Sequence, residues 1–150
     1  MLKTALLCLP LAALLAGCSA GDPAVSVEDP VVRLPAVQGN PGAAYFTLRA
    51  NRTPMRILGV SSPQIQRIEL HESEMEGGRM RMGPLEDNSF TTGGLKVFEE
   101  GGPHAMLFGI ASEVRAGGTV RLTFDFDNAP DVTVDVPVQT AVGPGGHGGH

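Results

Sequence analysis

Short runs in which every second residue is apolar recur along most of the chain. The clearest run is TVRLTFDFD at residues 119–127, and a second, VTVDV, follows at residues 132–136 after the turn-forming sequence NAPD. Alternation with a period of two predicts strands with one buried and one solvated face. No segment beyond the first eighteen residues shows a convincing helical stripe over twelve residues. The chain is therefore predicted to be all-β.

Apolar runs bounded by Gly, Pro, Asn and Asp define the expected strands. They cover residues 31–34, 44–49, 55–60, 66–72, 79–82, 95–98, 105–110, 119–127 and 132–136. Many short strands at this spacing are typical of a β-sandwich or a small barrel. The segment 31–138 is accordingly expected to form a single domain.

The first residues, MLKTALLCLPLAALLAGC, have a basic start and a short apolar run. The run is shorter than the roughly 20 residues that cross a bilayer, so it predicts a secretory signal at residues 1–17. Its end, Leu15-Ala16-Gly17-Cys18, resembles the bacterial lipobox, which predicts lipidation of Cys18 and a firm membrane anchor. The alternative is an ordinary cleaved signal with an incidental cysteine. A serine directly after the cysteine, here Ser19, resembles the sorting signal that directs lipoproteins to the outer membrane. The protein is therefore expected to be anchored there, on the periplasmic side of the envelope.

Charge and cysteine content exclude several classes of function. The net charge is −5 and no basic cluster occurs, so nucleic-acid binding has no electrostatic support. The two cysteines are Cys8 in the signal and Cys18 at the lipid site, which leaves the domain without a thiol. A disulfide framework, a Cys-x-x-Cys oxidoreductase and a blue-copper electron-transfer site are thereby excluded. Residues 18–30 are expected to be a tether, and residues 139–150 a disordered Gly/His tail.

Four residues carry the candidate chemistry: His71, Met82, His104 and Met106. Ten residues separate the first pair, twenty-one separate Met82 from His104, and Met106 completes a His-x-Met motif. Imidazole and thioether donors without thiolate or carboxylate suit Cu(I). On a strand, His104 and Met106 project to one face. We therefore expect a copper site at one rim, built from a strand end, a hairpin and the start of another strand.

The segments LHESEMEGGRMRM and GGPHAMLFGI resemble the PCu(A)C family of periplasmic copper chaperones. The gaps of ten and twenty-one residues between the candidate ligands both match the spacing of that family. The resemblance extends from about Val31 to Val138. It implies a cupredoxin-like Greek-key β-sandwich with the four residues above as Cu(I) ligands. It also implies delivery to the dinuclear copper centre of cytochrome c oxidase subunit II, together with a Sco-type copper protein. A methionine that follows the first histidine in some members is replaced by Glu72 here.

Other residues of the same types are weighed against simpler roles. Met75 and Met80 are either auxiliary ligands or exposed hairpin residues, and Met55 is expected in the core. His147 and His150 in the tail either capture Cu(II) weakly or are passive. The carboxylates near His71, at Glu69, Glu72, Glu74 and Glu76, are expected to be a solvated face rather than an acid–base pair.

Three functions compete at this stage. A non-enzymatic copper chaperone fits the resemblance and the ligand set. Copper sequestration for tolerance, by a lipoprotein of the envelope, would use the same site. A copper enzyme fits less well, because such enzymes generally need more histidine ligands than the two in the domain.

Overall fold

The computed structural model describes residues 21–141, and this part of the chain is built from strands without a helix. The ten strands are β1 (Val25–Arg33), β2 (Gly42–Ala50), β3 (Met55–Ser61), β4 (Ile65–Glu76), β5 (Arg79–Pro84), β6 (Ser89–Phe90), β7 (Leu95–Phe98), β8 (His104–Ile110), β9 (Thr119–Phe126) and β10 (Val132–Gln139). The all-β prediction is confirmed. The described part of the chain holds no helix long and apolar enough to cross a membrane.

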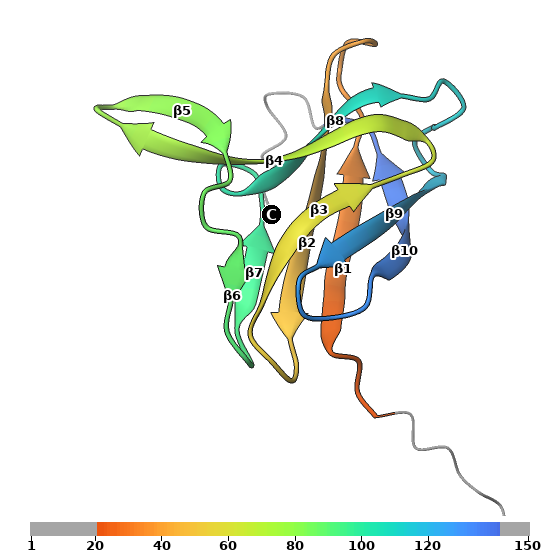
Figure 1. Cartoon of the computed structure of the whole chain (residues 1–150). Helices are drawn as coiled ribbons and strands as arrows, with labels where there is room; N and C mark the ends of the chain where they lie inside the picture. The colour runs from red at the N-terminus through yellow and green to blue at the C-terminus, as the bar shows by residue number, and fades with distance from the viewer. Residues whose placement is uncertain (1–20, 142–150) are drawn as a thin grey trace, which may run out of the picture.

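One hydrogen-bonded path connects the strands in the order β5-β4-β8-β2-β1-β10-β9-β3-β6, with β7 paired to β2. β1 and β10 run parallel, and the other paired strands run antiparallel. The path folds back on itself, so that β3 and β9 cross in front of β1 and β2 in Figure 1. A ring contact between Phe46 of β2 and Phe124 of β9 joins the two layers.

Alternation in β2 and β9 produces the core between these layers. Every second residue of β2 is buried, and β9 shows the same pattern at Val120, Leu122 and Phe124. The Phe46 ring stacks on Phe98 with centroids 4.4 Å apart and meets the edge of Phe124 at 4.8 Å. Offset and edge-on aromatic pairs of this kind add to the stabilisation from apolar burial. The opposite faces of both strands are left for solvent.

The first strand begins earlier than predicted. β1 starts at Val25, inside the segment 18–30 that was assigned to the tether. The pairing with β2 shifts between Glu28 and Val31, and Asp29 there has a φ of 48°. An Asp-Pro pair reads as a turn, but here it forms a bulge inside a continuing strand. The very short β6 was also missed, because two residues are too few to show alternation.

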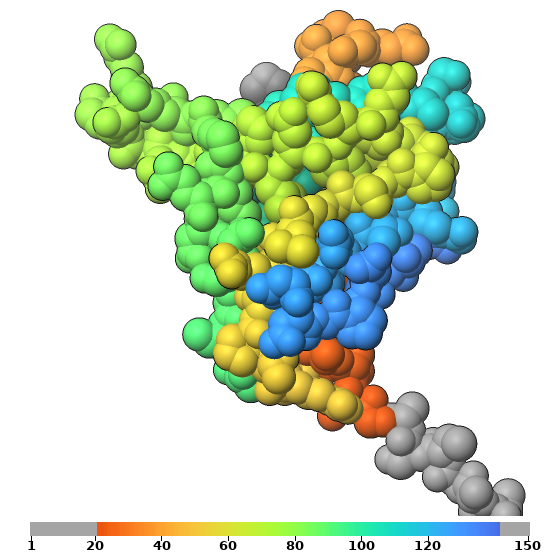
Figure 2. Space-filling view, in the orientation of Figure 1, coloured from red at the N-terminus to blue at the C-terminus, as the bar shows by residue number. Residues whose placement is uncertain are grey.

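The hairpin of β4 and β5 leaves the body of the protein, as Figures 1 and 2 show. His71 was expected near the end of a strand, whereas β4 continues beyond it to Glu76. The two strands are joined by Gly77 and Gly78, with φ values of 59° and 78°. Successive positive φ angles belong to the tight turns that suit the right-handed twist of a hairpin. The hairpin is therefore longer than predicted, and its second strand brings Met82 back towards the body of the protein.

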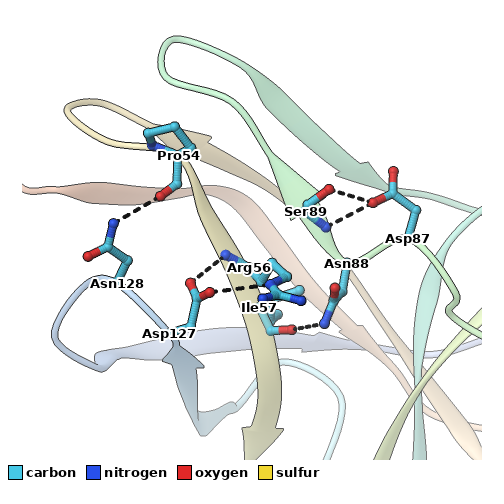
Figure 3. A network of polar contacts seen from close by, with 8 residues as sticks. All are labelled: Pro54, Arg56, Ile57, Asp87, Asn88, Ser89, Asp127 and Asn128. Carbon is cyan, nitrogen blue, oxygen red and sulfur yellow. Dashed lines mark hydrogen bonds and ion pairs between the residues drawn. The ribbon is translucent and has the colours of Figure 1, made fainter.

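A polar network fixes β3 and the segments beside it (Figure 3). The Asp127 carboxylate accepts hydrogen bonds from the Arg56 backbone N–H at 2.7 Å and from its Nε at 3.3 Å. Asn88 donates to the carbonyl oxygen of Ile57 at 2.9 Å. The Arg56 backbone N–H holds the pKa of Asp127 below its ordinary value of 3.8. These bonds tie the β9–β10 turn and the β5–β6 connection to one strand.

Candidate metal centre

Strand register brings the four predicted ligands to one face of the sheet. His71 of β4 lies directly opposite His104 of β8, and Ser73 of β4 lies opposite Met82 of β5. Opposite residues of antiparallel strands share a face, as do residues two apart on one strand. Met106 lies two residues beyond His104 and therefore faces the same way. The strand register alone therefore places the four residues on one face of the sheet.

Hydrogen bonds determine which nitrogen of His104 could bind a metal. Its Nδ1 lies 2.8 Å from the carbonyl oxygen of Gly102. A carbonyl can only accept, so Nδ1 carries the hydrogen and the neutral ring keeps its lone pair on Nε2. Metal-binding histidines commonly donate their second nitrogen in this way, which fixes the ring orientation. Gly102 belongs to the turn before β8, so that turn orients the ring.

His71 is oriented by a carboxylate. Its Nε2 lies 3.0 Å from Oε2 of Glu69, which leaves the lone pair of the neutral ring on Nδ1. That Nδ1 atom is buried and has no hydrogen-bond partner within residues 21–141. A buried polar atom without a partner is costly and calls for an explanation, which a bound cation would provide. The His71 and His104 ring centroids are 6.3 Å apart.

A cavity of about 280 Å³ opens beside the histidines and is lined by Met82, His104 and Met106. His71 does not line it. It borders a neighbouring hollow with Pro84 and Leu85, with its ring turned towards Glu69. Burial differs sharply across the group, since His104 is 7% exposed and Met82 is 55% exposed. The arrangement is closed on the His104 side and open on the Met82 side.

Charged and aromatic residues complete the cavity wall. Arg33 lies 3.4 Å from Glu100 and packs over the Tyr45 ring at 5.5 Å. Burial, and then the Glu100 carboxylate, raise the pKa of Tyr45, while Arg33 acts in the opposite direction. The phenol is therefore neutral at physiological pH, and Glu100 offsets the positive charge of Arg33. The neutral Tyr45 and the paired Arg33 therefore present no uncompensated charge to a bound cation.

Sequence reasoning missed these neighbours for different reasons. Glu69 was placed with the solvated carboxylates, yet it contacts His71 from two residues away on the same strand. Strand parity could have found it. Arg33, Tyr45 and Glu100 come from separate segments and reach the cavity only through the fold. No spacing rule connects them with the histidines.

The donors present fit a soft, monovalent cation. No group of three His, Cys, Asp or Glu side chains that could hold a metal occurs within residues 21–141. The further soft donors on this face are the thioethers of Met82 and Met106, and thioethers favour Cu(I) over Zn(II) or Mg(II). Two imidazoles and two thioethers are neutral, so they would leave the single charge of the cuprous ion unbalanced.

The remaining candidates fall into three groups. Met55 is 3% exposed and belongs to the core, which confirms that prediction. Met75 and Met80 lie opposite each other near the hairpin tip and are exposed. Cys18, His147 and His150 lie outside the described residues. Ala141, the last described residue, lines the cavity with Met82.

Together, the fold and these residues define a small all-β domain with an imidazole- and thioether-lined centre at one end of its sheet. The chain belongs to the LpqE-like family, whose description is "Putative lipoprotein LpqE-like", and the match covers residues 25–138. An uncharacterized protein of Rickettsia prowazekii (strain Madrid E) is 31% identical over 98 residues, which cover 64% of this chain and 54% of that protein. The chain thus spans about half the length of this curated relative.

Solved structures share the fold. The copper-bound PCuAC domain from PmoF2 superposes with a TM-score of 0.62 at 21% identity, over 79% of this chain and 94% of that domain. The apo PCuAC domain from PmoF1 gives 0.64 at 18% identity, over 79% and 95%. The Cu(I) form of DR1885 from Deinococcus radiodurans gives 0.56 at 24% identity, over 85% of both chains. These likenesses confirm the cupredoxin-like β fold.

Proposed function

We propose that this protein is a non-enzymatic Cu(I) chaperone of the bacterial envelope, with His71, Met82, His104 and Met106 as its copper ligands. One observation carries the proposal: His71 and His104 are cross-strand partners whose free ring nitrogens are set by Glu69 and Gly102. Met82 and Met106 lie on the same face. The fold shared with copper-bound PmoF2 and with Cu(I)-DR1885 supports this assignment.

The unequal exposure of the ligands suits transfer rather than storage. Met82 is largely exposed on the projecting hairpin, while His104 is buried in the sheet. A ligand of an acceptor protein can therefore replace Met82 first, without unfolding the domain. Thioethers are uncharged ligands with no proton to exchange, so this replacement needs no proton transfer at sulfur. The His104 nitrogen would retain the ion until the acceptor has bound it.

The acceptor proposed here is the dinuclear copper centre of cytochrome c oxidase subunit II, acting together with a Sco-type copper protein. This part of the proposal rests on the PCu(A)C resemblance of the ligand spacing. Membership in a family described as lipoproteins supports attachment to the envelope through Cys18. The anchor would keep the domain on the periplasmic side of the outer membrane. Replacing Cys18 with serine should release the protein into the aqueous phase of a detergent extraction.

Copper binding is tested by titrating the protein with Cu(I) against a competing chelator and by X-ray absorption. We expect one tightly bound ion with mixed nitrogen and sulfur coordination. The Met82→Leu/Met106→Leu variant should lose most of its affinity, because leucine keeps the volume but removes sulfur. Met55→Leu is the matched control, since this methionine is in the core. Wild-type affinity in the double variant would refute the ligand assignment.

Delivery is separated from sequestration by the phenotype of a deletion strain. Loss of delivery causes respiratory deficiency that added copper rescues. Loss of sequestration causes copper sensitivity while respiration at low copper is normal. The first result is expected, and the second would replace the chaperone proposal with a tolerance function for the same site.

A further inference from the structure

Three methionines are exposed along one face of the projecting β4–β5 hairpin. Their exposed fractions are 66% for Met75, 59% for Met80 and 55% for Met82. Such residues gain little from burial at these positions, and β-branched residues are better strand formers. Packing and strand propensity therefore do not account for methionine at these sites. The property that remains is the thioether, which is a soft metal ligand.

The hairpin register pairs two of these side chains directly. Met75 lies opposite Met80, and Glu76 and Arg79 flank the Gly77-Gly78 turn. In a hairpin closed by two residues, the flanking pair is hydrogen-bonded and the next pair is not. Non-hydrogen-bonded partners have Cα atoms about 4.5 Å apart and bring their side chains closest. Both thioethers can therefore reach one ion.

Met82 lies between the Met75–Met80 pair and the cavity, on the same face of the hairpin. Met82 lies two residues after Met80 on β5 and opposite Ser73, so its side chain shares the face of the Met75–Met80 pair. Same-face neighbours on adjacent strands lie within about 7–8 Å, which long side chains can span. Met82 also lines the cavity that contains His104 and Met106. Thioethers are thus spaced continuously from the hairpin tip to the histidines.

The opposite face of the hairpin has a different character. It carries Glu74 opposite Arg81 and Glu76 opposite Arg79, and Glu76 pairs with Arg81 at 2.9 Å. These charges are solvated and keep the exposed hairpin soluble. Because the two faces are separated by strand alternation, no charged side chain interrupts the methionine face between Ser73 and Met82. The neutral face is suited to a cation that prefers sulfur.

We propose that Met75 and Met80, with Met82 beside them, form a second, outer Cu(I) site made only of thioethers, through which copper enters and leaves the inner His71–His104 site. The inference rests on the proposed function, because it assumes that the inner site holds Cu(I). Copper stays Cu(I) throughout and Met82 belongs to both ligand sets, so inward transfer exchanges the thioethers of Met75 and Met80 for that of Met106 and for the imidazoles of His71 and His104. The outer site lacks imidazole, so it binds more weakly and fills after the inner site.

The test follows the methionine methyl signals of the full-length protein in detergent by NMR during titration with Cu(I). The first equivalent should shift the signals of Met82 and Met106, and the second should shift those of Met75 and Met80. The Met75→Leu/Met80→Leu variant should lose the second equivalent and keep the first at wild-type affinity. It should also release Cu(I) to a chelator more slowly, whereas Met55→Leu should match the wild type in both measurements.

Two results would overturn the outer site: unmoved Met75 and Met80 signals through two equivalents, or a second equivalent retained by the double variant. The proposed inner site fails separately. If the first equivalent leaves Met82 and Met106 unmoved while Met75 and Met80 respond, copper binds the hairpin alone and the His71–His104 assignment is wrong. A competing titration with Ag(I), which shares the preference for thioethers, should reproduce the order of filling.

Discussion

His71 of β4 and His104 of β8 are directly opposed across an antiparallel strand pair, with ring centroids 6.3 Å apart. Their separation is set by backbone pairing rather than by a flexible loop. Each ring has its own anchor, Glu69 for His71 and the Gly102 carbonyl for His104. Two of the four proposed ligands are thus oriented by hydrogen bonds before a metal binds.

Removing the carboxylate that orients His71 should weaken copper binding without removing a ligand. In Glu69→Gln, the contact at 3.0 Å loses its charge. Changes to such outer partners of metal-binding histidines typically cost about 10- to 100-fold in affinity. We expect a loss in that range in a Cu(I) competition titration, with an unchanged count of sulfur ligands. Glu74→Gln, on the other face of β4, is the control, and equal affinities in both variants would contradict the role of Glu69.

The hairpin turn should tolerate asparagine and resist a β-branched residue. Gly77 has a φ of 59°, and Asn-Gly is a favoured sequence for a tight turn of this kind. Gly77→Val should destabilise the protein by about 1–2 kcal/mol, because a left-handed conformation crowds its Cβ atom. It should also weaken Cu(I) binding, since the hairpin carries Met82. Urea unfolding measures the first effect, and Gly77→Asn should match the wild type in both.

Acid should weaken the link between β3 and the β9–β10 turn. The pKa of Asp127 is lower in the folded protein than its ordinary value of 3.8, chiefly because the Arg56 backbone N–H donates to it. The unfolded chain then binds more protons, so this contribution is present above about pH 4 and is lost as pH falls through the folded pKa. The Asp127→Asn variant should lose less stability between pH 7 and pH 3 than the wild type. Parallel pH curves in urea unfolding would refute this.

Deleting residues 143–150 should abolish weak Cu(II) binding and leave Cu(I) affinity nearly intact. The segment offers only two imidazoles, those of His147 and His150, so it is expected to bind Cu(II) weakly. The deletion is informative because Ala141 already lines the cavity with Met82. A large loss of Cu(I) affinity would show that the tail completes the inner site. Titrations of both oxidation states, with and without the tail, distinguish these results.

Local pattern was enough to predict most of the strands and the candidate ligands. Alternation is a property of a few consecutive residues, so β9 and β10 could be recognised with their buried faces. The two ligand gaps could likewise be counted along the chain, and strand parity already placed His104 and Met106 on one face. These predictions needed no knowledge of which strands pair.

Tertiary structure decided what depends on pairing and on distant segments. The opposition of His71 and His104 follows from the register of β4 with β8, which no spacing of residues specifies. Arg33 and Glu100 meet at the cavity because β1 and the turn before β8 converge there. The extension of β1 through Asp29 depends on pairing with β2 on both sides of the bulge. Hydrogen bonds between strands outweigh the local turn preference of an Asp-Pro pair, and that competition is settled only in the folded sheet.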